Sequence, residues 1–270
     1  MIEKGNQINT PQLLVSSSSS SSSTHNHYNH HYLVSVTAAL RFEHLPLLSV
    51  IQHKLANNNN NNSKHLPQMA SLTSPTTIKI AALSGSLRAG SFNHRLLQAA
   101  AKLLPDEFVT LDIIDYSDLP FFSQDLESES LLPKSVKTFR ETISQYDAVL
   151  FATPEYNGSF PGILKNAIDW GSRPYGQSSW KGKAVGFMGA TPANYAGSPG
   201  TGRAQHHLRQ VTGLLNMLPV LQPEVLMTNS YENFDAEGNL TNEFYKQRIT
   251  DHLKELVKLA RMTKSYHEFY

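Results

Sequence analysis

Small polar residues and glycines crowd into residues 84–93, which read Ser-Gly-Ser-Leu-Arg-Ala-Gly-Ser-Phe-Asn. Repeated hydroxyl groups, two glycines and one cation, Arg88, are typical of a loop that cradles a phosphate group with backbone N–H groups and side chains. The segment is not a Walker motif, because Ser91 stands where the lysine belongs, and it lacks the Gly-x-Gly-x-x-Gly pattern of dinucleotide-binding turns. We therefore predict a phosphate-binding loop; the alternative is a polar turn that ends in a helix N-cap.

A second unusual segment, residues 153–162, reads Thr-Pro-Glu-Tyr-Asn-Gly-Ser-Phe-Pro-Gly. Two prolines and two glycines fix an irregular and rigid path. Such a loop can direct consecutive backbone amides at the edge of a planar heterocycle, and Tyr156 and Asn157 lie within it. In the segment behind it, Lys165 and Asp169 have the spacing of a surface ion pair. Trp170 is expected in the core or at an interface, with stacking on a ligand as the alternative.

A third segment, residues 189–202, is long, rich in small residues and without charge. Loops of this length inside a compact domain are usually functional or disordered. Two interpretations therefore stay open: a backbone-lined wall for a flat ring, or a mobile surface loop. His206 and His207 follow, but adjacent histidines point to different faces of a helix, so we predict no metal site.

The three segments each follow an apolar run that predicts a buried parallel strand. Five strands are expected, the last of them bent around Pro223: residues 78–84, 109–115, 148–153, 184–189 and 220–227. Five helices alternate with them, the last with Thr241 as its N-cap: residues 93–104, 136–145, 162–170, 202–218 and 241–262. This alternation favours an open α/β parallel sheet with helices on both faces. Ligands bind beyond the carboxyl ends of the strands in such sheets, which is where the three segments lie.

Composition excludes several kinds of protein. The chain of 270 residues has no cysteine, which excludes disulfides, thiolate metal sites, iron–sulfur clusters and a cysteine nucleophile. Its 23 Lys and Arg against 22 Asp and Glu give a net charge of +1, which argues against a nucleic-acid partner. No apolar run is long enough to predict a membrane span.

Residues 1–75 differ in composition from the rest of the chain. Serine fills residues 16–23, asparagine fills residues 57–62, and between these runs four histidines cluster at residues 25–31. We predict a disordered low-complexity extension here and one folded domain over residues 76–264. The extension is serine-rich and poor in acids, as transit peptides are, but it has one arginine and no clear amphipathic helix. We expect a cytoplasmic protein, with organellar targeting as the alternative and Met69 as an alternative start.

Residues 78–262 resemble the NADPH-dependent FMN reductases of flavodoxin-like fold. The resemblance rests on three stretches: residues 85–93, 154–170 and 202–210. Within the family, the chain is most similar to the plant-type NADPH:quinone oxidoreductases and to the bacterial chromate and quinone reductases. The resemblance implies a doubly wound, five-stranded parallel sheet of order 2-1-3-4-5, and a homodimer or homotetramer.

The resemblance also implies FMN as cofactor and NADPH as electron donor. It assigns the FMN phosphate to one run of residues: Ser86, Leu87, Arg88, Ala89, Gly90, Ser91, Phe92 and Asn93. It assigns the flavin ring to two short runs: Pro154, Glu155, Tyr156 and Asn157, and Ala190 and Thr191. Since FMN carries the hydride from NADPH to a quinone in a ping-pong cycle, no catalytic residue is expected. The candidates for the NADPH 2′-phosphate are Arg88, Arg95 and Arg173.

Other functions stay open at this point. An azo-dye, chromate or free-flavin reductase of the same family, and a flavin-binding sensor without turnover, fit the same residues. A flavodoxin-like electron carrier is usually strongly acidic, whereas the chain after residue 75 has 19 basic and 20 acidic residues, a net charge of −1. A serine hydrolase lacks support, because no Gly-x-Ser-x-Gly elbow occurs with a fitting Asp and His.

Overall fold

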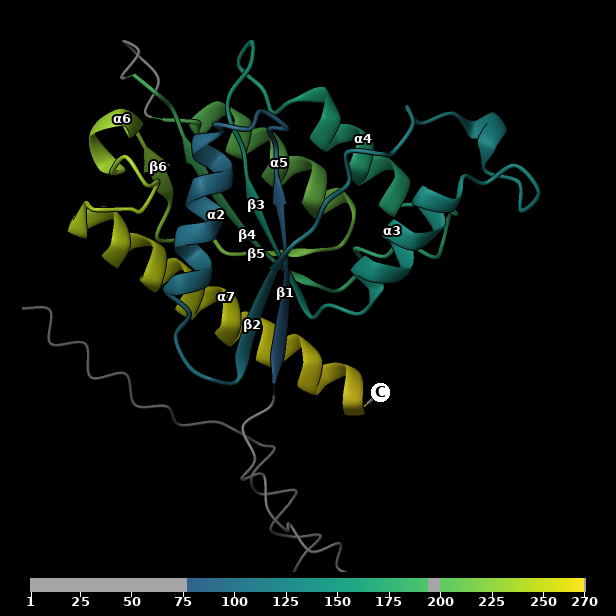
Figure 1. The fold of residues 1–270 in the computed structure, drawn as a ribbon. Coiled ribbons are helices and arrows are strands. Elements are labelled where there is room, and N and C mark those ends of the chain that lie inside the picture. Colours follow the sequence, from purple (N-terminus) through teal and green to yellow (C-terminus); the bar gives the residue numbers. More distant parts are fainter. Residues whose placement is uncertain (1–76, 194–199, 270) are drawn as a thin grey trace, which may run out of the picture. The chain divides into compact units, whose positions relative to one another are not determined.

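The protein is described by a computed structural model over residues 77–193 and 200–269. The predicted extension, residues 1–75, and the middle of the third loop lie outside these ranges. One parallel sheet forms the centre of the domain (Figure 1). Its strands are β1 (Ile78–Ser84), β2 (Val109–Ile113), β3 (Ala148–Ala152), β4 (Ala184–Ala190), β5 (Leu218–Pro219) and β6 (Val225–Met227). The order is β2-β1-β3-β4-β5, with β6 also paired to β4, which confirms the predicted order.

Two short strands share the fifth position in place of the single predicted strand 220–227. Leu218 of β5 lies opposite the start of β4, and Val225 of β6 lies opposite its end. Proline cannot donate a ladder hydrogen bond, and Pro223 lies between the two strands. The predicted helix 202–218 is also too long, because Asn216 takes a left-handed φ of 56° shortly after α5 ends. The sheet therefore has six strands in five positions.

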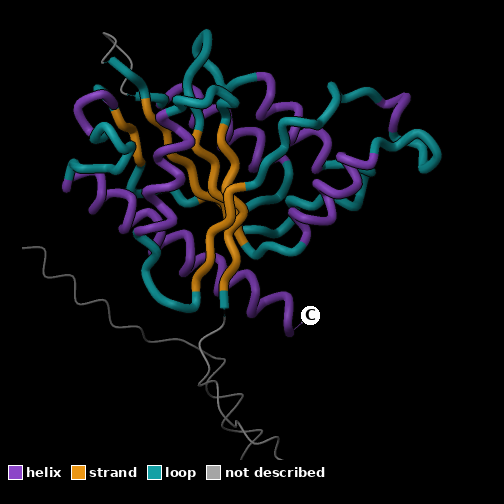
Figure 2. Tube along the Cα trace, viewed as in Figure 1, coloured by secondary structure: helices purple, strands orange, loops and turns teal. Residues whose placement is uncertain are grey.

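Helices cover both faces of the sheet, as predicted (Figure 2). On one face lie α2 (Phe92–Lys102) and α7 (Glu243–Phe269). On the other lie α3 (Lys134–Ser144), α4 (Gly162–Gly171) and α5 (Gly202–Leu214). Two short elements were not predicted: η1 (Gln124–Leu126) and α6 (Ser230–Asn233). No helix in the described ranges is both long and apolar enough to cross a membrane.

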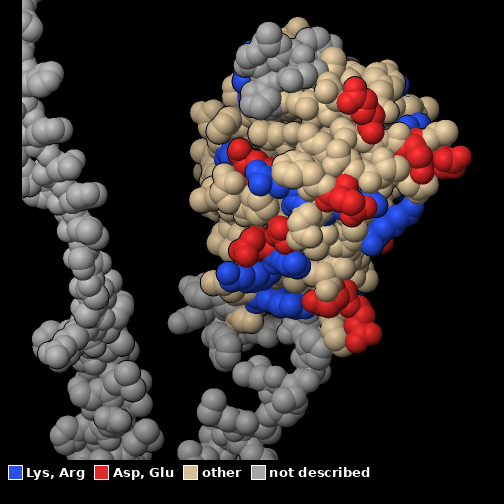
Figure 3. All heavy atoms as spheres, turned by 90° about the vertical axis from the view of Figure 1, so that its left-hand side faces the viewer, with Lys and Arg blue, Asp and Glu red and all other residues tan. Residues whose placement is uncertain are grey.

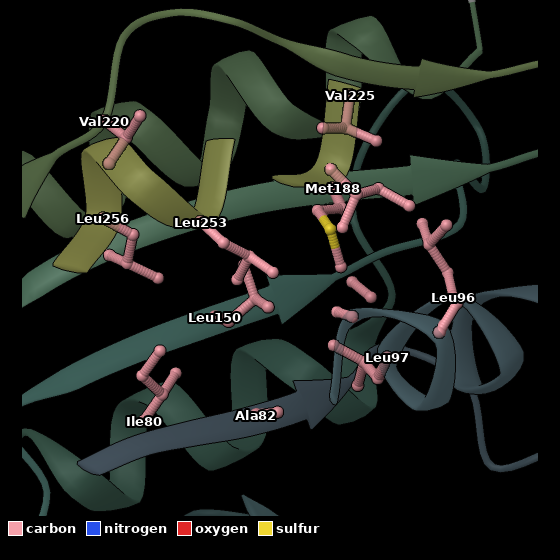
Figure 4. Close-up of a cluster of buried hydrophobic side chains, with 14 of the residues drawn as sticks. Ile80, Ala82, Leu96, Leu97, Leu150, Met188, Val220, Val225, Leu253 and Leu256 are labelled. Atoms are coloured by element: carbon pink, nitrogen blue, oxygen red, sulfur yellow. The ribbon is translucent and has the colours of Figure 1, made fainter. Parts of the chain in front are cut away.

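The alternation of side chains along each strand divides the core into two. Ile80 and Ala82 of β1 face α2 and α7, where Figure 4 shows them with Leu150, Leu253 and other aliphatic side chains. The second core, on the other face, contains Trp170, which is fully buried and donates from its indole nitrogen to the Pro120 carbonyl (2.8 Å). Trp170 is therefore a core residue, as expected, and its ring does not stack on a ligand at the surface.

Two local predictions about the helices have opposite outcomes. The side chains of Lys165 and Asp169 form the expected surface ion pair at 2.7 Å. Thr241, in contrast, does not cap the last helix: its hydroxyl donates to the Asn233 carbonyl (3.2 Å). Asn242 caps α7 instead, since its Oδ1 accepts from the Phe244 N–H (3.0 Å). The prediction misplaced the cap by one residue because both side chains are good N-caps.

A buried histidine of α7 closes the gap between β5 and β6. His252 accepts with Nε2 from the Phe187 N–H of β4 (3.1 Å), and its Nδ1 lies 2.7 Å from the Pro223 carbonyl oxygen. Because Nε2 accepts, Nδ1 must carry the proton, and the ring is neutral. Burial lowers the pKa of His252 to about 4. Gly186 makes room for the ring, since a side chain there would come within 2.7 Å of Nε2.

Candidate cofactor-binding site

The three predicted loops meet at the carboxyl edge of the sheet. A Cβ at Gly85 would lie 3.0 Å from Pro154 and 3.1 Å from the Thr153 hydroxyl, so the first and second loops are in direct contact. A Cβ at Gly189 would lie 2.7 Å from the Thr153 carbonyl oxygen and would overlap Thr201. Glycine is therefore required where the loops cross each other.

The first loop leaves a row of backbone N–H groups without an acceptor. Ser91 caps α2 by accepting from the His94 N–H (3.3 Å), and the Arg88 N–H reaches the Ser86 hydroxyl (3.4 Å). Within the described part of the chain, the remaining amides of the loop and the first helical turn have no partner: Leu87, Ala89, Gly90, Phe92 and Asn93. The Arg88 side chain is exposed and folds over Gly90. Free amides, a helix N-terminus and a guanidinium group together suit a phosphate.

Phe92 and Asn93 direct their side chains into the protein. Phe92 is 7 % exposed and stacks on Phe234 with ring centroids 5.8 Å apart. The buried amide of Asn93 donates to the Ala190 carbonyl (3.0 Å) and accepts from the Ala190 N–H (2.9 Å). The Asn93 side chain therefore ties the start of α2 to the end of β4. The backbone amides of both residues remain open to a ligand.

The second loop ends in a tight turn. Tyr156 and Ser159 exchange two backbone hydrogen bonds of 2.8 and 3.0 Å, and Asn157 and Gly158 between them have φ of 51° and 76°. Positive φ at both central residues is the geometry of a type I′ turn, for which Asn-Gly is the preferred sequence. The Tyr156 side chain is 55 % exposed at this tip. Pro154, at the base of the loop, is buried.

Glu155 makes contacts that sequence reasoning did not anticipate. One oxygen of its nearly buried carboxylate accepts from the backbone N–H groups of Arg203 (3.0 Å) and Ala204 (3.3 Å) in the first turn of α5. The other oxygen accepts from the Arg203 Nε (2.6 Å). Glu155 thus caps α5 and fixes the second loop to it. The residues are 48 positions apart in sequence, so no local pattern indicates the contact.

Ala190 and Thr191, from the third loop, are held in place on both sides. Besides its bonds with Asn93, this stretch is bonded to β6, because the Thr191 N–H donates to the Met227 carbonyl (2.9 Å). The Thr191 carbonyl accepts from both the N–H (3.0 Å) and the hydroxyl (2.7 Å) of Ser230. Both residues are buried, so they offer a ligand little beyond the surface of the strand end.

Two of the other side chains considered from the sequence, Arg173 and His207, already have partners. Arg173 binds Glu127 with two nitrogens at 2.8 and 2.7 Å. His207 lies 2.9 Å from the Ser159 hydroxyl, and within the described residues no three His, Cys, Asp or Glu side chains gather as metal ligands. A cavity of about 670 Å³ lies between α2 and residues 237–240, and none of the predicted site residues lines it.

The loops together can hold a phosphate and one edge of a flat ring. The unpartnered amides and Arg88 supply the positive charge that a phosphate requires. The backbone of residues 154–157 and of residues 190–191, fixed by Glu155 and Asn93, can form a rigid wall beside it. This arrangement fits the phosphate and ring of FMN, although which of the fourteen predicted residues contact it stays a prediction.

Comparison with known proteins finds similar oxidoreductases. The 2-hydroxy-1,4-benzoquinone reductase of Burkholderia sp is 43 % identical over 166 residues, which cover 62 % of this chain and 87 % of the relative. The NAD(P)H:quinone oxidoreductase of Solanum tuberosum is 42 % identical over 192 residues, which cover 69 % of this chain and 95 % of the relative.

A solved structure has the same fold. FerB, a flavoenzyme NAD(P)H:(acceptor) oxidoreductase from Paracoccus denitrificans, superimposes with a TM-score of 0.62 at 34 % identity. The match covers 69 % of this chain and 99 % of FerB. Residues 78–232 match the family model described as NADPH-dependent FMN reductase, and they contain all three loops. The chain belongs to the NADPH-dependent FMN reductase family.

Proposed function

We propose that this protein is an FMN-dependent NAD(P)H:quinone oxidoreductase. The observation that carries the proposal is the first loop, whose unpartnered amides and exposed Arg88 suit the phosphate of FMN. Relatives at about 40 % identity are named quinone reductases or NAD(P)H:quinone oxidoreductases, which supports quinones as acceptors. NADPH is the proposed donor and a quinone the proposed acceptor of a two-electron, ping-pong transfer.

The residues of the chain bind and orient the cofactor. Bound FMN supplies the hydride chemistry, which needs no acid or base from the protein. The amides of the first loop and Arg88 hold the phosphate, while the backbone of residues 154–157 and the end of β4 border the ring. Asn93 and Glu155 keep these walls at a fixed separation, because each bonds one loop to a different element of the fold.

An absorption spectrum of the purified protein tests the proposal. We expect the spectrum of an oxidised flavin, its loss on anaerobic addition of NADPH, and its return when a benzoquinone is added. A protein that stays colourless after FMN is supplied would refute the assignment of all three loops. If NADPH does not bleach the bound flavin, the protein binds flavin but is not an NADPH-dependent reductase.

Two further expectations, one on the oligomeric state and one on the location, remain part of the proposal. The expected homodimer or homotetramer is tested by size-exclusion chromatography with light scattering, and a monomeric mass would contradict this expectation. The cytoplasmic location is tested by microscopy of the full chain carrying a C-terminal fluorescent tag. Organellar fluorescence would favour the alternative interpretation of residues 1–75.

A further inference from the structure

The structure separates the three arginines that the sequence offers for the 2′-phosphate of NADPH. Arg173 is already bound by the Glu127 carboxylate through two nitrogens. Arg88 lies on the first loop and folds over Gly90, where the proposed function needs it for the FMN phosphate. Arg95, one turn into α2, forms no ion pair and no side-chain hydrogen bond with any residue in the described ranges. Arg95 is therefore the one of these three that is available to a second phosphate.

Arg95 is nevertheless held in place. Its guanidinium carbon lies 5.7 Å from the centroid of the Phe92 ring, and its Nε lies about 3.3 Å from where a Cβ of Gly238 would be. The side chain is half-buried between these two neighbours. A guanidinium group that is positioned by an aromatic ring and keeps its N–H donors free is well prepared to bind a phosphate with two hydrogen bonds.

An exposed aromatic ring shares the same support. Tyr231, on α6, is 73 % exposed, and its ring meets the edge of Phe92 with centroids 4.8 Å apart at an angle of 87°. Its neighbour Ser230 binds the Thr191 carbonyl with both its N–H and its hydroxyl. Tyr231 therefore stands beside both the first and the third loop. A large exposed ring at this place offers a face on which a purine can stack.

The surface around α6 carries charges of both signs, so it does not act as one negative patch that would repel a phosphate. Figure 3, which views the side of the molecule that carries α6, shows basic and acidic groups interspersed. Asp235 accepts from the backbone N–H (2.7 Å) and the side-chain amide (3.1 Å) of Asn239, which hold its carboxylate in the turn. Glu232 and Glu237 are exposed to solvent, where salt and water screen their charges.

We infer that Arg95 and Tyr231 form the subsite for the adenosine end of NADPH, in which Arg95 pairs with the 2′-phosphate and Tyr231 stacks on the adenine. The inference rests on the proposed function and adds to it the basis of a preference for NADPH over NADH. NADH has the adenine but lacks the 2′-phosphate. The two residues therefore differ in what they contribute: Tyr231 to both donors, and Arg95 to NADPH alone.

Steady-state kinetics of the FMN-loaded protein with each donor test this assignment. We expect Arg95→Gln to raise the KM for NADPH about tenfold or more, with the KM for NADH changed less than twofold. Tyr231→Leu should raise the KM for both donors to a similar extent. Lys102→Gln is the matched control, because it removes a positive charge two turns further along α2, beside the 670 Å³ cavity, and should change neither constant.

Calorimetric titration gives a readout that does not depend on turnover. The FMN-loaded wild type should bind 2′,5′-ADP more tightly than 5′-AMP, and Arg95→Gln should remove that difference while flavin content and circular dichroism stay unchanged. Equal KM values of the wild type for NADPH and NADH, or an equal effect of Arg95→Gln on both, would overturn the subsite. If Lys102→Gln instead raised the KM for NADPH alone, the subsite would be wrong and the 2′-phosphate would bind at the 670 Å³ cavity.

The failure of the proposed function looks different. A wild type that oxidises neither donor would refute the reductase activity. Selective binding of 2′,5′-ADP that depends on Arg95 would still support the subsite in such a protein.

Discussion

His252 gives the sharpest test of how the sheet is held together. Its ring replaces the missing strand between β5 and β6, where it accepts from the Phe187 N–H and donates to the Pro223 carbonyl. Replacing it with leucine leaves both buried groups without a partner. Each unsatisfied group costs about 1–3 kcal/mol, so we expect His252→Leu to lower the free energy of unfolding at pH 7.5 by about 2–6 kcal/mol.

The pH dependence adds a second, independent expectation. The pKa of His252 is lowered from 6.5 to about 4 in the folded protein, so the unfolded chain binds more protons between these pH values. The stability contributed by the neutral ring is complete above pH 6.5 and is lost as the pH falls toward 4. Between pH 7.5 and pH 5 this loss amounts to about 2 kcal/mol, at 1.36 kcal/mol for each pKa unit.

Urea unfolding at the two pH values measures both effects. The wild type should lose about 2 kcal/mol more than His252→Leu between pH 7.5 and pH 5, since the variant lacks the titrating group. His206→Leu, which removes an exposed histidine of α5, is the control and should unfold like the wild type at pH 7.5. Parallel pH dependence in the wild type and His252→Leu would refute the neutral, doubly bonded ring.

Three further substitutions test the loops. Arg88→Ala should lower the flavin retained after gel filtration and leave the free energy of unfolding within about 0.5 kcal/mol, because the side chain is exposed; equal flavin content would contradict its role. Asn93→Leu leaves the Ala190 N–H and carbonyl unpaired, and should cost about 2–5 kcal/mol in urea unfolding; wild-type stability would show that water replaces the amide. Gly189→Ala places a carbon 2.7 Å from a backbone oxygen, so it should lower the melting temperature of the protein. Gly162→Ala, with open space around it, should leave the melting temperature unchanged.

The regular elements were predictable where burial follows the local sequence. The strand at residues 78–84 has its predicted bounds, and β3 and β4 differ from theirs by one residue at one end, because apolar residues dominate each of these runs. Residues 220–227 are apolar at both ends but contain Gln222, Pro223 and Glu224 in the middle. The gap in the strand lies there, and it is filled by His252, a side chain some thirty residues further on that binds the edge of β4 in place of a strand.

The site divides in the same way. The composition of the first and second loops marked them as binding segments, and the Asn-Gly turn at residues 157–158 follows from local turn chemistry. The sequence did not indicate which side chains of the loops point into the protein, because their partners are far away in sequence. Asn93 meets Ala190 across 97 positions, and Glu155 meets α5 across 48. Sequence alone therefore predicts both residues as ligand contacts, whereas the structure places their side chains in bonds between the loops.

The turn at residues 156–159 has a consequence for how such a protein can diversify. Its closure rests on two main-chain hydrogen bonds and on the backbone shape of Asn157 and Gly158, and none of these involves the exposed ring of Tyr156. Exchange of that ring for another side chain therefore costs the fold little. Since the ring stands at the rim of the proposed flavin site, selection for a new acceptor can act at this position while the folding of the domain stays unaffected.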